Sequence, residues 1–331
     1  MRTRVTSTVA RITAGLLLLG ILFYFKWIDV DVVRTALKHP ATLAFAVLIC
    51  GCATPAAALR WHILLRSQGL LLRLVETIRI SFIAAFFGTF LPGGVGGDLV
   101  RVVYIHQATA GRRTSALLSI FVDRLVGLAA LMLCGVLVSL WRPFSEQSWL
   151  EHATTLVALS LLFAIAAVLF AGDRILSRLG AVVENKWPKL SNVANGTAVA
   201  LKDYRRAWPA LLLSFVASLL VAGMLVGAVV AIAVFMQFGG LDAGRYAIAA
   251  AYGIVINSLP TTPGGLGVGE SAFASFCVAL QTTPSATPYG TIFLLFRCVV
   301  MLSALPGLLV YMIYPQRAKL LEAVNTDDAA I

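Results

Sequence analysis

The chain has 331 residues, of which 60% are hydrophobic and only 12% are charged, and its mean hydropathy is +0.90. Soluble domains carry roughly twice that share of charged residues, and a chain of this length cannot hide so much apolar surface from water. These values exclude a soluble globular protein and indicate an integral membrane protein. The net charge of +11 does not indicate nucleic acid, because the basic residues flank apolar runs and form no stripe with interleaved aromatic residues.

The apolar runs predict six transmembrane spans, because a helix needs about 20 apolar residues to cross the hydrocarbon. In chain order the spans are Ile12–Phe25, Ala41–Leu59, Ser115–Leu140, Ala153–Ala171, Trp208–Phe238 and Tyr289–Tyr314. The first span follows three arginines, as the apolar part of a secretory signal peptide would. No small-residue cleavage site follows it, however. We therefore expect this first helix to be retained.

Glycine and proline interrupt two further apolar stretches. The first stretch has arms at 75–91 and 99–108 around Pro92–Asp98, and the second has arms at 246–259 and 271–280 around Pro260–Glu270. Glycine and proline at this density stop a helix, and each arm is too short to cross the bilayer comfortably. We predict two re-entrant helical hairpins. The predicted fold is an all-α polytopic membrane protein, with six spans and two hairpins in one transmembrane domain over residues 1–331.

The distribution of lysine and arginine predicts the orientation of the chain. With a cytoplasmic N-terminus, the cytoplasmic segments hold 17 of these residues and the outer segments hold 5, as the positive-inside rule requires. We therefore expect both termini in the cytoplasm of a bacterium and the protein in its inner membrane. The longest loop, residues 172–207, is basic and cytoplasmic, and we expect an interfacial helix in it rather than a soluble domain.

The two interruptions resemble each other. Pro92-Gly-Gly-Val-Gly-Gly-Asp98 matches Pro263-Gly-Gly-Leu-Gly-Val-Gly-Glu270 with one residue inserted. Asp98 precedes Arg124 by 26 residues, and Glu270 precedes Arg297 by 27. Three spans separate the hairpins, and this odd number means that they enter from opposite faces. We predict an inverted repeat of residues 75–140 and 245–314, a layout in which secondary transporters place their substrate near the bilayer midplane.

The chemistry of the interruptions favours an anionic ligand. A helix that starts after a glycine run offers backbone N–H groups without intrahelical partners, and its partial positive charge favours phosphate or carboxylate. Arginines can add bidentate contacts, while Asp98 and Glu270 can balance the arginines or bind a proton or a cationic headgroup. The candidate substrate-binding residues are Gly93, Gly94, Gly96, Gly97, Asp98, Arg101, Asp123, Arg124, Asn257, Thr262, Gly264, Gly265, Gly267, Glu270 and Arg297.

A purely structural role stays open for these charged residues. Four acids (Glu76, Asp98, Asp123 and Glu270) and four bases (Arg79, Arg101, Arg124 and Arg297) lie in or near apolar stretches. They could simply neutralise one another, because an unpaired charge in hydrocarbon is costly. Asn257 and Thr262 could cap a helix instead of binding a ligand. We predict no metal and no cofactor, because the histidines are scattered and the five cysteines form no ligand pattern.

Four motifs together resemble the flippase-like transmembrane domain of lysylphosphatidylglycerol synthase/flippase proteins. The motifs are Arg60-Trp61-His-Ile-Leu-Leu, Pro92-Gly-Gly-Val-Gly-Gly-Asp98-x-x-Arg101, Asp123-Arg124-x-x-Gly127-Leu128 and Pro263-Gly-Gly-Leu-Gly-x-x-Glu270. The resemblance extends from about Ile12 to Tyr314 and implies movement of a lipid between leaflets. The soluble domain that attaches the amino acid in bifunctional members does not follow in this sequence, so we expect no synthase activity. Other members of the family are linked to polyprenyl-phosphate-sugar or hopanoid pathways.

These observations predict a lipid flippase or transporter, and not an enzyme, whose substrate is a phospholipid or a polyprenyl-phosphate-linked lipid. The first alternative is an ion-coupled transporter of a small anion. The second is a membrane glycosyltransferase that uses a lipid-phosphate donor. The third is an accessory membrane protein that works with enzymes of envelope lipid or glycan synthesis. The sequence does not indicate the oligomeric state.

Overall fold

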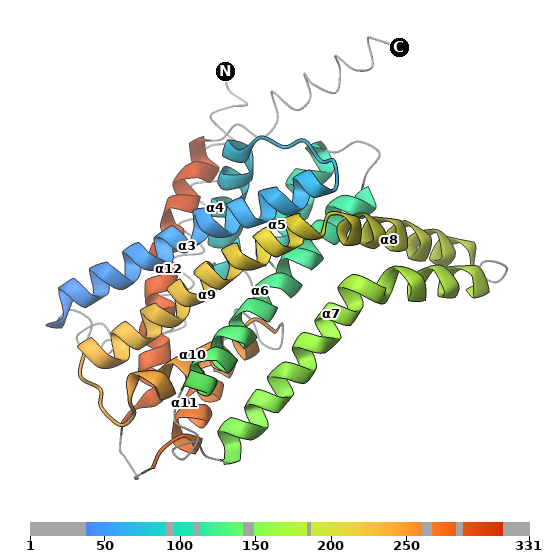
Figure 1. Ribbon diagram of the computed structural model, residues 1–331. Coiled ribbons are helices and arrows are strands. Elements are labelled where there is room, and N and C mark those ends of the chain that lie inside the picture. The colour runs from blue at the N-terminus through green and yellow to red at the C-terminus, as the bar shows by residue number, and fades with distance from the viewer. Residues whose placement is uncertain are drawn as a thin grey trace.

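The structure is a computed structural model that describes residues 38–90, 96–108, 113–141, 149–183, 187–259, 267–282 and 287–313. Within these ranges every regular element is a helix (Figure 1). The all-helical prediction is therefore confirmed for the part of the chain that is described. Several predicted features lie outside it: the first span, Gly93, Gly94, Thr262, Gly264 and Gly265.

Five long helices coincide with the other five predicted spans. They are α3 (Pro40–Ser67), α6 (Arg113–Trp141), α7 (Trp149–Val183), α9 (Trp208–Phe235) and α12 (Tyr289–Ile313). Each is long and apolar enough to cross a bilayer. The helix α3 continues eight residues beyond the predicted end at Leu59, because Arg60 is buried in the protein instead of marking the membrane surface.

Both glycine-rich interruptions separate two short helices. The first pair is α4 (Leu74–Phe90) and α5 (Gly96–Ala108), and the second is α10 (Ala243–Asn257) and α11 (Val268–Ala279). The two pairs lie at opposite ends of the molecule, the first at the top and the second at the bottom of Figure 1. The prediction that each apolar stretch breaks into two arms at its glycines agrees with these helices.

Glycine is required where the arms of each pair meet. A Cβ atom on Gly97 would lie 2.5 Å from the backbone oxygen of Ala84, and one on Gly88 would lie 3.3 Å from the Cα atom of Gly97. The backbones of α4 and α5 can therefore approach each other only because both residues lack a side chain. In the second pair, Gly267 caps the N-terminus of α11 with a φ of +77°, a backbone conformation that residues with side chains rarely adopt.

The predicted basic loop 172–207 is mostly helical. The helix α7 runs beyond the predicted span to Val183, and α8 (Pro188–Arg206) returns toward the bundle. An ion pair of 3.1 Å between Arg205 and Asp173 joins the two helices. Figure 1 shows this pair of helices projecting from one side of the molecule.

The core lies where α9, α10 and α12 pack together with α6, because these helices supply most of the buried residues of the largest apolar cluster, and α3 packs along α9 beside it. Small residues such as Ala46 on α3 and Ala222 on α9 are fully or almost fully buried in the largest apolar cluster. Small side chains let membrane helices approach closely, which replaces the hydrophobic drive that lipid cannot supply. By contrast, most of α7 exposes its apolar side chains, including Leu156 and Phe163, as a helix at the edge of a lipid-embedded bundle does.

Candidate functional site

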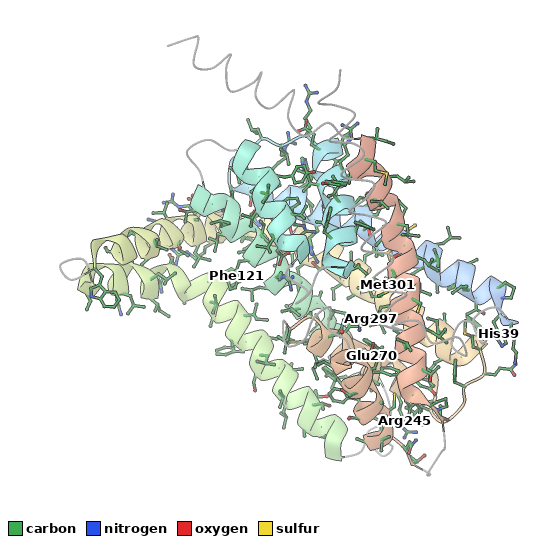
Figure 2. The ribbon with its side chains drawn as sticks, turned by 180° about the vertical axis from the view of Figure 1, so that it is seen from behind. His39, Phe121, Arg245, Glu270, Arg297 and Met301 are labelled. Atoms are coloured by element: carbon green, nitrogen blue, oxygen red, sulfur yellow. The ribbon has the colours of Figure 1, made fainter. Side chains whose placement is uncertain are left out.

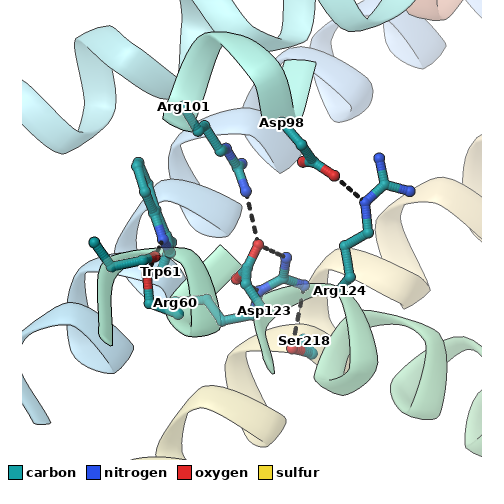
Figure 3. A network of polar contacts seen from close by, with 9 residues as sticks. Arg60, Trp61, Asp98, Arg101, Asp123, Arg124 and Ser218 are labelled. Atoms are coloured by element: carbon teal, nitrogen blue, oxygen red, sulfur yellow. Dashed lines mark hydrogen bonds and ion pairs between the residues drawn. The ribbon is translucent and has the colours of Figure 1, made fainter. Parts of the chain in front are cut away.

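Asp123 on α6 is the centre of a buried charged network (Figure 3). Its Oδ1 atom accepts a hydrogen bond of 2.6 Å from Arg60 Nε, and its Oδ2 atom accepts one of 2.8 Å from Arg60 Nη2. Oδ2 also accepts a 2.8 Å hydrogen bond from Arg101 Nη1. The Asp123 side chain is only 2% exposed. One carboxylate therefore faces two guanidinium groups, and this network carries a net charge of +1.

The two arginines of this network are held by neighbouring side chains. Arg60 also donates from Nη1 to the hydroxyl of Ser218 on α9, at 3.3 Å. Gly127 leaves the room that Arg60 occupies, since a Cβ atom there would lie 2.9 Å from Arg60 Nη1. The guanidinium of Arg101 lies over the ring of Trp61, 4.7 Å from its centroid, where a cation is attracted by the aromatic face. These contacts fix the positive charges before any ligand arrives.

Arg124, the next residue on α6, connects the two broken elements. Its Nε atom donates to Asp98 Oδ2, in the first turn of α5. Its Nη1 atom donates to the backbone oxygen of Ser258, the residue that caps the C-terminus of α10, at 3.3 Å. One guanidinium thus contacts the start of α5 in the first helix pair and the end of α10 in the second helix pair.

A cavity of about 410 Å³ opens beside both networks. This volume lies within the range of small-molecule binding sites, roughly 300–1,000 Å³. The charged residues that line it are Arg60, Asp98, Arg101, Asp123 and Arg124, which together carry a net charge of +1. The hydroxyl of Ser81 also lines it, is buried, and has no hydrogen-bond partner in the part of the chain that the structure describes. The cavity therefore combines surplus positive charge with an unused hydroxyl.

A second ion pair repeats the arrangement of Asp98 and Arg124. Arg297 Nη1 on α12 donates to Glu270 Oε1 at 2.8 Å, and both side chains lie close together in Figure 2. Asp98 is the third residue of α5, and Glu270 is the third residue of α11. The offsets of 26 and 27 residues in the sequence thus correspond to two ion pairs, each between the first turn of a short helix and the following long helix.

Residues 9–322 match the family model for the lysylphosphatidylglycerol synthase TM region. The chain belongs to this family. The match includes all the described helices, and with their apolar length it shows a multi-pass membrane protein of a family connected with lipid metabolism or transport. Comparison with curated proteins and with solved structures finds no match.

In this family member the structure brings together five of the predicted site residues. Those that line the cavity are Gly97, Asp98, Arg101, Asp123 and Arg124. Gly96 begins α5 next to them. The described lining of the cavity does not include Asn257, Gly267, Glu270 or Arg297. These residues lie where α11 packs against α10 and α12, and there Gly269 lies against the side chain of Asn257.

Sequence reasoning missed the residues that support the cavity from other helices. They are Arg60 on α3, Ser81 on α4, Ser218 on α9 and Ser258 after α10. The position of Arg60 had one usable signal: the apolar residues Ile63, Leu64 and Leu65 follow it, so the helix did not have to end there. The serines carried no signal, because a hydroxyl in an apolar helix usually bonds to its own backbone, as Ser218 does to the Ser214 oxygen.

Proposed function

We propose that this protein moves a phosphate-bearing lipid between the leaflets of a bacterial inner membrane. The headgroup phosphate binds in the cavity between Arg101 and Arg124, and the acyl or prenyl chains stay in the surrounding lipid. The observation that carries this proposal is the cavity itself, with a net charge of +1 among helices long enough to span a membrane. A charge at that depth is costly, so residues of this kind in membrane spans usually serve function.

The geometry favours phosphate over other ligands. Arg101 and Arg124 approach the cavity from α5 and α6, and planar guanidinium groups suit phosphate oxygens because they can donate two hydrogen bonds each. The Ser81 hydroxyl offers one more donor. Asp98 and Asp123 are each bonded to arginine, so they hold the cations in place and cancel only part of their charge. A ligand with one negative charge completes the balance.

In this proposal the chain has six spans and cytoplasmic termini, and the two hairpins form an inverted repeat. The lipid moves between the leaflets when one half of this repeat shifts against the other. In support, the hairpins lie at opposite ends of the molecule (Figure 1), and each contributes an acid paired with an arginine of the next long helix. The bond from Arg124 to Ser258 is one contact between the repeats, which also pack together through α4 with α12 and through α6 with α10. Rocking of one repeat against the other would open this contact and expose the headgroup to the other leaflet.

The alternative functions require different ligands or catalytic groups at this site. A small soluble anion would fit the cavity as well, so an ion-coupled anion transporter is the second candidate. A glycosyltransferase would need a free carboxylate as base, whereas Asp98, Asp123 and Glu270 are all bonded to arginines. We therefore propose a protein that is not an enzyme. Partnership with enzymes of a lipid or glycan pathway belongs to this proposal as the source of its lipid.

Lipid movement is tested with the purified protein in proteoliposomes. One set of vesicles carries fluorescent phosphatidylglycerol, and a matched set carries a fluorescent glycosyl diacylglycerol that lacks phosphate. We expect the protein to speed the exchange of the phosphate-bearing lipid between leaflets above the rate in empty vesicles, and to leave the matched lipid at that rate. Uptake of radiolabelled inorganic phosphate without lipid exchange would overturn the proposal in favour of the anion transporter.

A further inference from the structure

The last 12 residues of α7, from Gly172 to Val183, extend beyond the part of that helix that a membrane can cover. At 1.5 Å per residue the 35 residues of α7 reach about 50 Å, whereas the hydrocarbon is only about 30 Å thick. The apolar run ends at Ala171, and Asp173 and Arg174 follow. The remaining turns of α7, from Gly172, and the helix α8 together form a structure that we name the helical arm (Figure 1).

The inner face of the helical arm is fixed to the bundle. The hydroxyl of Tyr204 donates to the backbone oxygen of Leu64 at 3.4 Å, and Gln68 Nε2 donates to the backbone oxygen of Ala200 at 3.2 Å. Leu201 lies in the apolar cluster that also contains Leu64 and Val122. The arm therefore has a defined orientation, and its opposite face points away from the bundle.

The outer face of α7 in the arm combines exposed apolar and basic side chains. Ile175, Leu179 and Val182 are 58%, 51% and 82% exposed, and Arg174 and Arg178 are exposed beside them. At 100° per residue these five side chains fall within an arc of about 140°, with the arginines along one side of it. Exposed Trp187 follows where α7 gives way to α8.

The helix α8 continues the same chemistry. Val199 and the cations Lys202 and Arg206 are exposed on it at helical spacing. Over residues 172–207 the sequence holds seven basic residues and three acids. The outer face therefore offers an apolar row, a cationic row and a tryptophan on elements that leave the bilayer directly from a membrane span.

We propose that the outer face of the helical arm is a docking surface for anionic lipid headgroups. Ile175, Leu179 and Val182 rest at the boundary of the acyl chains, and the guanidinium groups of Arg174 and Arg178 meet the lipid phosphates. Basic and apolar residues on one face are typical of helices that lie in the membrane interface, where long cationic side chains reach the headgroups and tryptophan is enriched. Continuity with the span in α7 places this face beside the bilayer, which favours lipid over a soluble protein.

Depth measurements on the full chain test this surface. Single cysteines at 175, 179 and 182, in a background without the native cysteines, carry a nitroxide in vesicles that contain phosphatidylglycerol. At these positions we expect the nitroxide to collide more often with dissolved oxygen, which concentrates in lipid, than with a nickel complex, which stays in water. Ser177 is the matched control, because it is also exposed in this segment of α7 but lies outside the arc, and S177C should favour the nickel complex. Equal access of nickel to positions 177, 179 and 182 would overturn the proposal.

The charge of the surface is tested separately. The double variant R174E/R178E should lower the fraction of spin-labelled phosphatidylglycerol that is immobilised at the protein by at least about twofold. The reason is that each basic residue near the membrane surface adds measurably to the attraction between the protein and anionic lipid. The matched control is K38E, which reverses an exposed charge at the start of α3 and should leave this fraction unchanged. An unchanged fraction in the double variant would overturn the role of the arginines. Both readouts are independent of lipid translocation.

Discussion

Replacing Asp123 with asparagine is expected to destabilise the folded protein by about 3–5 kcal/mol, the typical cost of removing one partner of a buried ion pair. The substitution preserves the shape of the side chain but leaves the guanidinium groups of Arg60 and Arg101 without their shared anion. Both groups are at least 87% buried, so water in the cavity replaces the lost carboxylate only in part. The measurement is equilibrium unfolding in micelles, followed by far-UV circular dichroism.

Asp242 provides the matched control for this variant. It also pairs with an arginine, Arg245, at 3.2 Å, but its side chain is 46% exposed. It caps the N-terminus of α10 by accepting from the backbone N–H of Arg245, and asparagine caps a helix about equally well. D242N should therefore change the free energy of unfolding by less than about 1 kcal/mol. Equal effects of D123N and D242N would show that the network around Asp123 does not hold the bundle together.

Replacing Arg124 with alanine is expected to slow the movement of phosphate-bearing lipid by about tenfold or more, while the protein still folds. The variant removes a charged donor from the cavity, and hydrogen bonds to charged groups contribute roughly 1.5–3 kcal/mol each. It also removes the link to Ser258 between the hairpins. The measurement is the exchange rate in proteoliposomes, normalised to the amount of folded protein. R124K should be intermediate, because lysine keeps the charge but lacks the bidentate fork.

Two further variants separate binding from charge balance. If Arg124 served only to neutralise Asp98, the double variant D98A/R124A would restore movement, since it removes both charges at once. We expect the double variant to stay as slow as R124A. R245A, which removes an arginine that does not line the cavity, should move lipid at the rate of the unmodified protein. Recovery in the double variant would contradict a role of Arg124 in binding the headgroup.

The sequence predicted the elements of this fold better than their contacts. Apolar runs located five spans, because a bilayer demands a minimum length of apolar helix, although α3 and α7 continue 8 and 12 residues beyond their predicted ends. The sequence showed matched positions of Asp98 and Glu270 after glycine-rich segments and left open whether these acids balance arginines or bind a cation. In the structure both acids are bonded to the arginine of the next long helix. These inferences use local patterns, and a single sequence records local patterns directly.

Long-range contacts escaped the same reasoning. Arg60 follows an apolar run and therefore looked like the end of a span, whereas it is bonded to Asp123, 63 residues later, and to Ser218, 158 residues later. The two ion pairs have almost the same sequence pattern, yet only Asp98 and Arg124 line the cavity. Which pair faces the cavity depends on the packing of several helices, and neither motif contains that information.

The central claim is that a lipid phosphate occupies the cavity between Arg101 and Arg124. Native mass spectrometry of the protein, after gentle extraction from its membrane, tests this claim most directly. We expect a phosphate-bearing lipid to stay bound to the unmodified protein and to R245A, and to be lost from R101A and R124A. Retention of the same lipids by all four proteins, or of lipids without phosphate alone, would contradict it.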